Sequence, residues 1–78
     1  IDPTEAQARV RQAEQQAESA LAQVRIAQRS QANNQALVQQ GFISATALEN
    51  SQANLAAAEA THRAAVAALD IARKGLGD

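Results

Sequence analysis

The sequence predicts an all-α chain that folds as an antiparallel two-helix coiled-coil hairpin. Three observations lead to this fold class. The 78 residues include 21 alanines together with many Gln, Glu, Arg and Leu residues, all of which favour helices. The main breaker signal inside the chain is a single site around Gly41. On both sides of that site, small and apolar residues recur at alternating spacings of three and four, as in a coiled coil.

The first predicted helix covers about residues 3–40. Asp2 precedes Pro3, and proline suits the first helical position because its missing N–H is not needed there. Glu5 follows Asp2 by three residues, so the pair resembles a capping box with Asp in place of the usual Ser or Thr. No further Pro or Gly occurs before Gly41. We therefore expect one uninterrupted helix of about 55 Å.

The predicted turn covers residues 41–44. Gly41 can take the left-handed conformation that ends a helix, and Ser44 can accept a backbone N–H and begin the next one. Ile43 and Leu48 occupy the two positions of a hydrophobic staple around that cap. These signals together predict a tight turn between two helices.

The second predicted helix covers about residues 45–74. It contains no breaker, and Arg73 and Lys74 lie in its last turn, where cations interact favourably with the helix dipole. Gly75 and Gly77 are expected to end it. Residues 1–78 are thus expected to form one hairpin, cut from a longer protein.

Each predicted helix carries a stripe of small and apolar residues, and the two stripes form what we call the seam. Folding the chain back at the turn pairs residues whose numbers sum to 85 or 86, so that Ala17 meets Leu69 and Val10 meets Leu76. The two stripes were read separately and meet in register, which supports the hairpin. The seam comprises Ala6, Val10, Ala13, Ala17, Ala20, Val24, Ala27, Gln31, Asn34 and Val38, and then Leu48, Ser51, Leu55, Ala58, His62, Ala65, Leu69, Ala72 and Leu76.

The seam contains polar layers near the turn, formed by Gln31, Asn34 and Ser51. Polar seam residues fix the register at a cost in stability. Two alanine-rich helices on their own are marginally stable in water. We therefore expect neighbouring copies, the remaining domains of a parent protein, or both, to stabilise the hairpin.

Composition argues against several classes of function. The net charge of −1 provides no basic field for nucleic acid. The chain has no cysteine and a single histidine, His62, so we expect no metal site and no cofactor. Ser, His and acidic residues all occur, but a hairpin offers no concave pocket in which to assemble them, so we expect no enzyme. We interpret His62 as a partly solvated seam residue.

The end of the hairpin that contains the turn differs from the rest. Residues 30–48, which we call the tip, carry no formal charge over nineteen positions. They contain Leu37 and Phe42, the only aromatic residue of the chain. Protein interfaces are depleted of charge at their centres and enriched in aromatic residues. The tip is therefore a candidate docking surface, although Leu37 alternatively covers the last seam layer and the neutral stretch alternatively reflects turn chemistry alone.

Residues 37–60, LVQQGFISATALENSQANLAAAEA, resemble the hairpin tip of periplasmic adaptor proteins, also called membrane fusion proteins, of the HlyD-like family. The turn signature of that family is a Leu, a Gly, an apolar pair ending in Ile, a Ser and then an acidic residue. The corresponding residues here are Leu37, Gly41, Ile43, Ser44 and Glu49.

The two ends of the chain resemble the family as well. Ile1-Asp2-Pro3 is similar to the end of the first lipoyl half-motif, which leads into the hairpin, and residues 67–73 are similar to the return into the second half. The resemblance thus covers essentially the whole chain.

This resemblance implies a function. Such adaptors link an inner-membrane transporter to an outer-membrane channel in Gram-negative efflux or secretion systems. It also implies that the tip meets the channel, that neighbouring adaptor copies form a hexamer, and that the parent protein lies in the periplasm, anchored to the inner membrane. The partner-binding residues expected here are Asn33, Leu37, Gly41, Phe42 and Ser44.

Two positions depart from the family pattern. Family tips carry an Arg, a Leu four residues on and a Ser seven further, and the Arg position falls on Asn33, which lacks the charge and bidentate fork of arginine. Relatives often place an acid where this chain has Ala47, so Ser44 is expected to cap the second helix alone.

Two other classes remain open at this point. One is a spacer or structural coiled coil without a specific tip partner. The other is an amphipathic segment at a membrane surface, for which an excess of Lys and Arg on the polar face is expected. Seven basic residues are balanced here by eight acidic ones.

Overall fold

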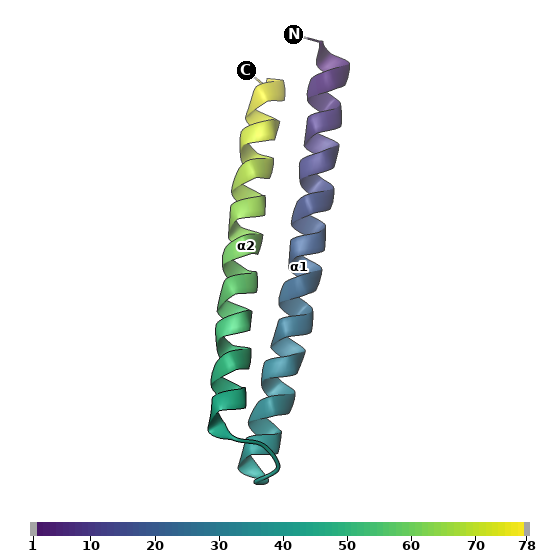
Figure 1. Ribbon diagram of the computed structural model, residues 1–78. Helices are drawn as coiled ribbons and strands as arrows, with labels where there is room; N and C mark the ends of the chain where they lie inside the picture. The colour runs from purple at the N-terminus through teal and green to yellow at the C-terminus, as the bar shows by residue number, and fades with distance from the viewer. Residues whose placement is uncertain (1, 78) are drawn as a thin grey trace.

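The computed structural model describes residues 2–77, which form two long α-helices, α1 (Pro3–Gln39) and α2 (Ala45–Gly77). Figure 1 shows the helices antiparallel and side by side, with both chain ends at one end of the molecule and the turn at the other. The expected all-α two-helix hairpin is confirmed. Ile1 and Asp78, and with Ile1 part of the expected lipoyl-like segment, lie outside the described residues.

The hairpin is long and narrow, with extents of 59 × 13 × 12 Å. Its radius of gyration is 17.6 Å, whereas a compact domain of this length has about 11.5 Å. Neither helix, over the described residues, has a stretch long and apolar enough to cross a membrane.

The start of α1 follows the sequence signal in part. Asp2 is the N-cap, and its Oδ1 accepts the backbone N–H of Thr4 at 2.9 Å. Glu5 does not complete a capping box, because its Oε1 accepts from Nη2 of Arg9 at 2.7 Å. One helical turn separates these two residues, so a surface ion pair is the nearer option for the Glu5 carboxylate.

The ends of the two helices differ from the prediction at both C-termini. α1 ends at Gln39, with Gln40 as its C-cap, one residue before the expected end. α2 continues to Gly77, so the predicted stop at Gly75 is wrong. Among the described residues only Gly41 has a positive φ. A glycine that stays right-handed costs a helix about 1 kcal/mol relative to alanine, which is too little by itself to end it.

The seam is where the two helices pack. All the buried apolar residues of the described chain belong to the predicted stripes: Ala13, Ala17, Ala20, Val24 and Leu69. Ala13, Ala17 and Leu69 form one cluster, against which Val10, Ala65 and Ala72 pack. The predicted meeting of Ala17 with Leu69 is therefore confirmed.

One predicted seam layer, that of Val10 and Leu76, is only partly buried. Leu76 is 45% exposed, although Val10 opposite is half-buried. This layer is the last of the described hairpin, so no further layer covers Leu76 from the side of the chain ends. The burial expected for Leu76 from its heptad position is therefore wrong.

Ser51 and Asn34, two of the polar seam residues near the turn, form hydrogen bonds. Ser51 is 4% exposed, and its Oγ donates to the backbone oxygen of Leu48 at 2.8 Å. Nδ2 of Asn34 donates across the hairpin to the backbone oxygen of Ala47 at 3.4 Å. The Ser51 bond lies within α2, whereas the Asn34 bond joins the two helices and so favours one register over its neighbours.

Candidate functional site: the tip of the hairpin

The turn is a Schellman motif. Gly41 N–H donates to the backbone oxygen of Val38 at 3.0 Å, and Phe42 N–H donates to that of Leu37 at 2.9 Å. Gly41 has a φ of +80°, as this motif requires of the residue after the cap. These bonds satisfy carbonyl groups that the end of α1 would otherwise leave without partners. The predicted role of Gly41 in ending the first helix is confirmed.

The same motif joins Phe42 to Leu37 through a backbone hydrogen bond. In a Schellman motif the residue after the glycine often contacts the residue that accepts its N–H bond, here Leu37. Even so, Phe42 remains 72% exposed and Leu37 36% exposed. Turn formation therefore leaves most of the Phe42 ring in water, and the far end of the hairpin carries exposed apolar surface.

Ser44 begins α2. Its Oγ accepts the backbone N–H of Ala47 at 3.4 Å, and its backbone oxygen accepts the same group at 3.1 Å. The predicted cap is thus present, and Ser44 itself is exposed. Ile43 and Leu48, the two staple positions, are both half-buried. The turn is therefore stabilised on the α1 side by the Schellman hydrogen bonds and on the α2 side by the Ser44 cap.

Asn33 and Leu37 lie on one side of α1 and line a shallow hollow of about 420 Å³ with Ile26, Ser30 and Asn34. This hollow brings together two of the five predicted site residues, whereas Gly41, Phe42 and Ser44 lie in or next to the turn.

Ile26 is a residue of this surface that the sequence reasoning missed. It is 61% exposed. The available signal was its spacing: Ile26, Ser30, Asn33 and Leu37 follow one another by four, three and four residues, one position before each seam residue. An apolar residue that lies off the seam at helical spacing from a candidate site belongs to the same face.

Arg29 supplies the one formal charge of the hollow. It stands one helical turn before Asn33, about 6 Å along the helix. A guanidinium is therefore present on this side of α1. It can still donate to a carboxylate or carbonyl group of a partner.

His62 lies apart from the tip, half-buried in the seam of α2. Among the described residues no group of three or more His, Asp and Glu side chains is placed to hold a metal ion.

No protein-family model, curated protein or solved structure matches this chain.

Proposed function

We propose that this chain is the α-helical hairpin of a periplasmic adaptor that links an inner-membrane transporter to an outer-membrane channel in a tripartite efflux or secretion system. In this proposal the tip docks on the channel. The observation that carries it is the exposure of Phe42 in the turn and of Leu37 at the end of α1, both within an uncharged stretch. Exposed apolar and aromatic side chains without neighbouring charges are typical of an interface centre.

The shape of the hairpin supports this role. Both chain ends lie at one end of a molecule 59 Å long, and the turn lies at the other. Domains attached to the two ends would therefore stand far from the surface that Phe42 contacts. The resemblance of residues 37–60 to the HlyD-like family supplies the identity of the partners: a channel at the tip, adaptor copies alongside that form a hexamer, and a transporter reached through other domains. The same resemblance supports a location in the periplasm, with the parent protein anchored to the inner membrane, as part of this proposal.

The test is an export or drug-resistance assay with the full-length adaptor that carries Leu37→Asp. A carboxylate at the centre of an apolar contact should abolish transport, because truncating one anchor side chain already costs about tenfold or more in affinity and a ring of copies multiplies the loss. Leu37 is exposed, so the variant should keep its normal abundance on an immunoblot. Normal export at wild-type abundance would refute docking through the tip.

Two further substitutions sharpen the test. Asn33→Arg restores the family residue beside Leu37 and should preserve or strengthen docking. Ser44→Ala is a less clean probe, because it also removes a helix cap worth about 1 kcal/mol. Export by the Ser44 variant should therefore be compared at matched protein levels.

A spacer coiled coil is the second candidate, and the Schellman motif favours it. The motif offers a structural reason for an apolar residue at Phe42, namely contact with Leu37. The sequence that flanks the hairpin in its gene distinguishes the two. Lipoyl half-motifs on both sides would support the adaptor, and their absence would support the spacer.

A further inference from the structure

One arginine lines the hollow that continues the tip along α1. Arg29 stands directly before the uncharged residues 30–48, and it is the one formal charge among the side chains that line this hollow. Leu37 lines the same hollow and is also part of the proposed docking surface. A partner that covers Leu37 therefore reaches Arg29 with about 12 Å more of contact along α1.

The Arg29 guanidinium has no carboxylate partner within the part of the chain that the structure describes. No acidic residue stands three or four positions away from it on α1. Arg9, which lines a hollow near the chain ends, differs in this respect, because its Nη2 lies 2.7 Å from Oε1 of Glu5. The Arg29 donors thus remain available to a bound partner.

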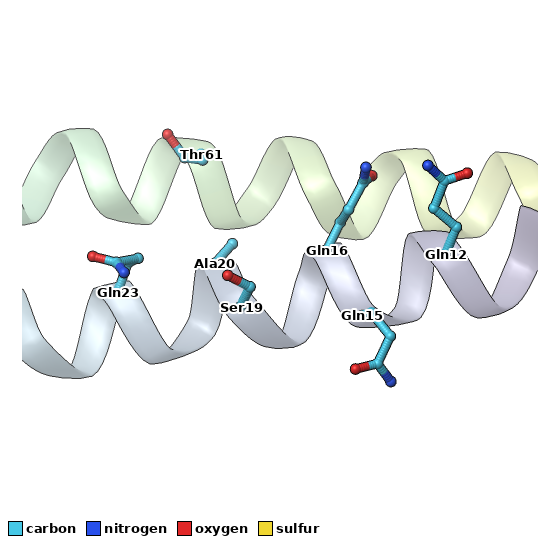
Figure 2. A pocket seen from close by; sticks show the side chains of 7 residues that line it. All are labelled: Gln12, Gln15, Gln16, Ser19, Ala20, Gln23 and Thr61. Atoms are coloured by element: carbon cyan, nitrogen blue, oxygen red, sulfur yellow. The ribbon is translucent and has the colours of Figure 1, made fainter.

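Another hollow, further along the shaft, shows what the arginine adds. Figure 2 shows Gln12 and Gln16 extending toward α2 beside this hollow, whereas Gln15 points away. All the side chains that line it are uncharged. It measures about 450 Å³, close to the 420 Å³ of the hollow at Arg29, so size does not distinguish the two. The arginine does, because an ionic contact selects the charge of the group that binds there.

The surface along residues 26–37 is arranged to receive a helix. Its spacings of four, three and four residues are those of the seam, and such a stripe packs against another helix. Its two ends are apolar, since Ile26 is 61% and Leu37 36% exposed. Ile26 also borders a second hollow of about 260 Å³, which Asn54 of α2 lines on the other side. Ile26 therefore projects between two hollows, as a knob does in helix packing.

The charge of Arg29 defines the chemistry of that helix. A guanidinium that loses its water without gaining an ionic partner opposes binding. A carboxylate can instead accept two of its N–H groups in a bidentate pair. We propose that Arg29 binds a carboxylate of the docking partner, and that the partner helix which carries this acidic residue packs along residues 26–37. This inference rests on the proposed function, because it extends the contact of the partner that covers the tip.

Site-specific photocrosslinking of the full-length adaptor in cells tests the extended surface. A photoreactive phenylalanine derivative replaces Phe42, Ile26 or Gln28 in turn, and mass spectrometry identifies the crosslinked peptides. Phe42 and Ile26 should crosslink to the same partner protein. The peptide captured from Ile26 should contain an Asp or Glu within about one helical turn of the crosslinked residue. Gln28, which is exposed on α1 but lies outside the hollow, should not capture this partner.

The crosslinks separate this inference from the proposed function. A partner captured from Phe42 but not from Ile26 would overturn the inference and leave docking at the tip intact. Capture of a second adaptor copy from Ile26 would also overturn it, by assigning the hollow to contacts between copies. No capture from either position would contradict both the inference and the proposed function.

Charge substitutions test the arginine itself. Arg29→Gln and Gln28→Glu each lower the net charge by one unit at neighbouring positions, one in the hollow and one outside it. With the photoreactive group at Phe42, Arg29→Gln should lower the crosslink yield about tenfold, and Gln28→Glu should leave it unchanged. Arg29→Lys keeps the positive charge and should retain most of the yield. Arg29 is exposed, so an immunoblot should show normal abundance. Equal yields from Arg29→Gln and Gln28→Glu would overturn the proposal.

Discussion

Gly41→Ala tests how strongly the turn depends on one backbone conformation. Gly41 has a φ of +80°, and a Cβ built there meets nothing within 4 Å. The cost of the substitution is therefore conformational and not steric. Holding a residue with a Cβ in the left-handed region costs about 1–2 kcal/mol, so we expect the free energy of unfolding to fall by that amount.

Gly75→Ala is the matched control. A Cβ at Gly75 also meets nothing within 4 Å, but Gly75 lies within α2 and has no positive φ. Alanine is favoured over glycine in a helix by up to about 1 kcal/mol, so this variant should be more stable than the natural chain. The same added methyl group is thus expected to have opposite effects at the two positions.

Thermal and urea unfolding of the two variants and the natural chain, followed by circular dichroism at one protein concentration, provide the measurement. A fixed concentration matters because any self-association would raise the apparent stability. If Gly41→Ala leaves the midpoint unchanged while Gly75→Ala raises it, the Schellman geometry at the turn is not what limits the hairpin. If both substitutions raise it, the left-handed conformation of Gly41 is incorrect.

Two predictions concern the seam, and Leu37→Asp, described above, concerns the tip. His62→Leu should raise the midpoint of thermal unfolding at neutral pH, because it completes a run of leucines at heptad spacing and removes a half-buried polar ring; a lower midpoint would contradict this assignment. Asn34→Ala should cost less than about 1 kcal/mol in the free energy of unfolding, because it removes a long hydrogen bond of 3.4 Å to the Ala47 oxygen. A larger loss in urea unfolding would mean that Asn34 determines more than the register.

Most of the fold could be predicted from the sequence because local and long-range signals agree. Gly41 and Ser44 fix where the chain turns, and each stripe alone indicates which side of its helix is buried. The register then follows from the position of the turn. Alanine helps in this case, since it has high helix propensity and fits a narrow seam.

The predictions that were wrong depend on the backbone conformation and on neighbouring side chains, which a residue pattern does not contain. Gly75 resembles a helix C-terminus in the sequence. A glycine of this kind ends a helix when its φ is positive, and Gly75 has no positive φ. Leu76 has the right heptad position, but burial requires a further layer of side chains beyond it. Ile26 was overlooked because the search followed the seam, and the neighbouring face became visible only once both helices were placed.

The tip itself could be identified only in part from sequence. The absence of charge and the presence of Phe42 single out the region, but they do not show whether the ring is used inside the turn. The backbone N–H of Phe42 donates to the Leu37 oxygen, and yet Phe42 remains 72% exposed. A short aliphatic side chain would serve the turn equally well, so the motif alone does not explain an aromatic residue of this size.

The hydrogen bonds that hold the tip bear on the proposed docking. Phe42 follows a glycine held by two backbone hydrogen bonds, Ser44 caps α2, and Asn34 ties α1 to the first turn of α2. A partner that contacts Phe42 and Leu37 therefore has little backbone to order on association, which lowers the entropic cost of binding. The shaft differs from the tip, because its two helices pack mainly through a narrow seam of alanines and leave much of their surface exposed. A hydrogen-bonded tip on a shaft with few buried side chains is what we expect of the proposed hairpin. In that proposal neighbouring copies or other domains stabilise the shaft, and the tip makes a specific contact.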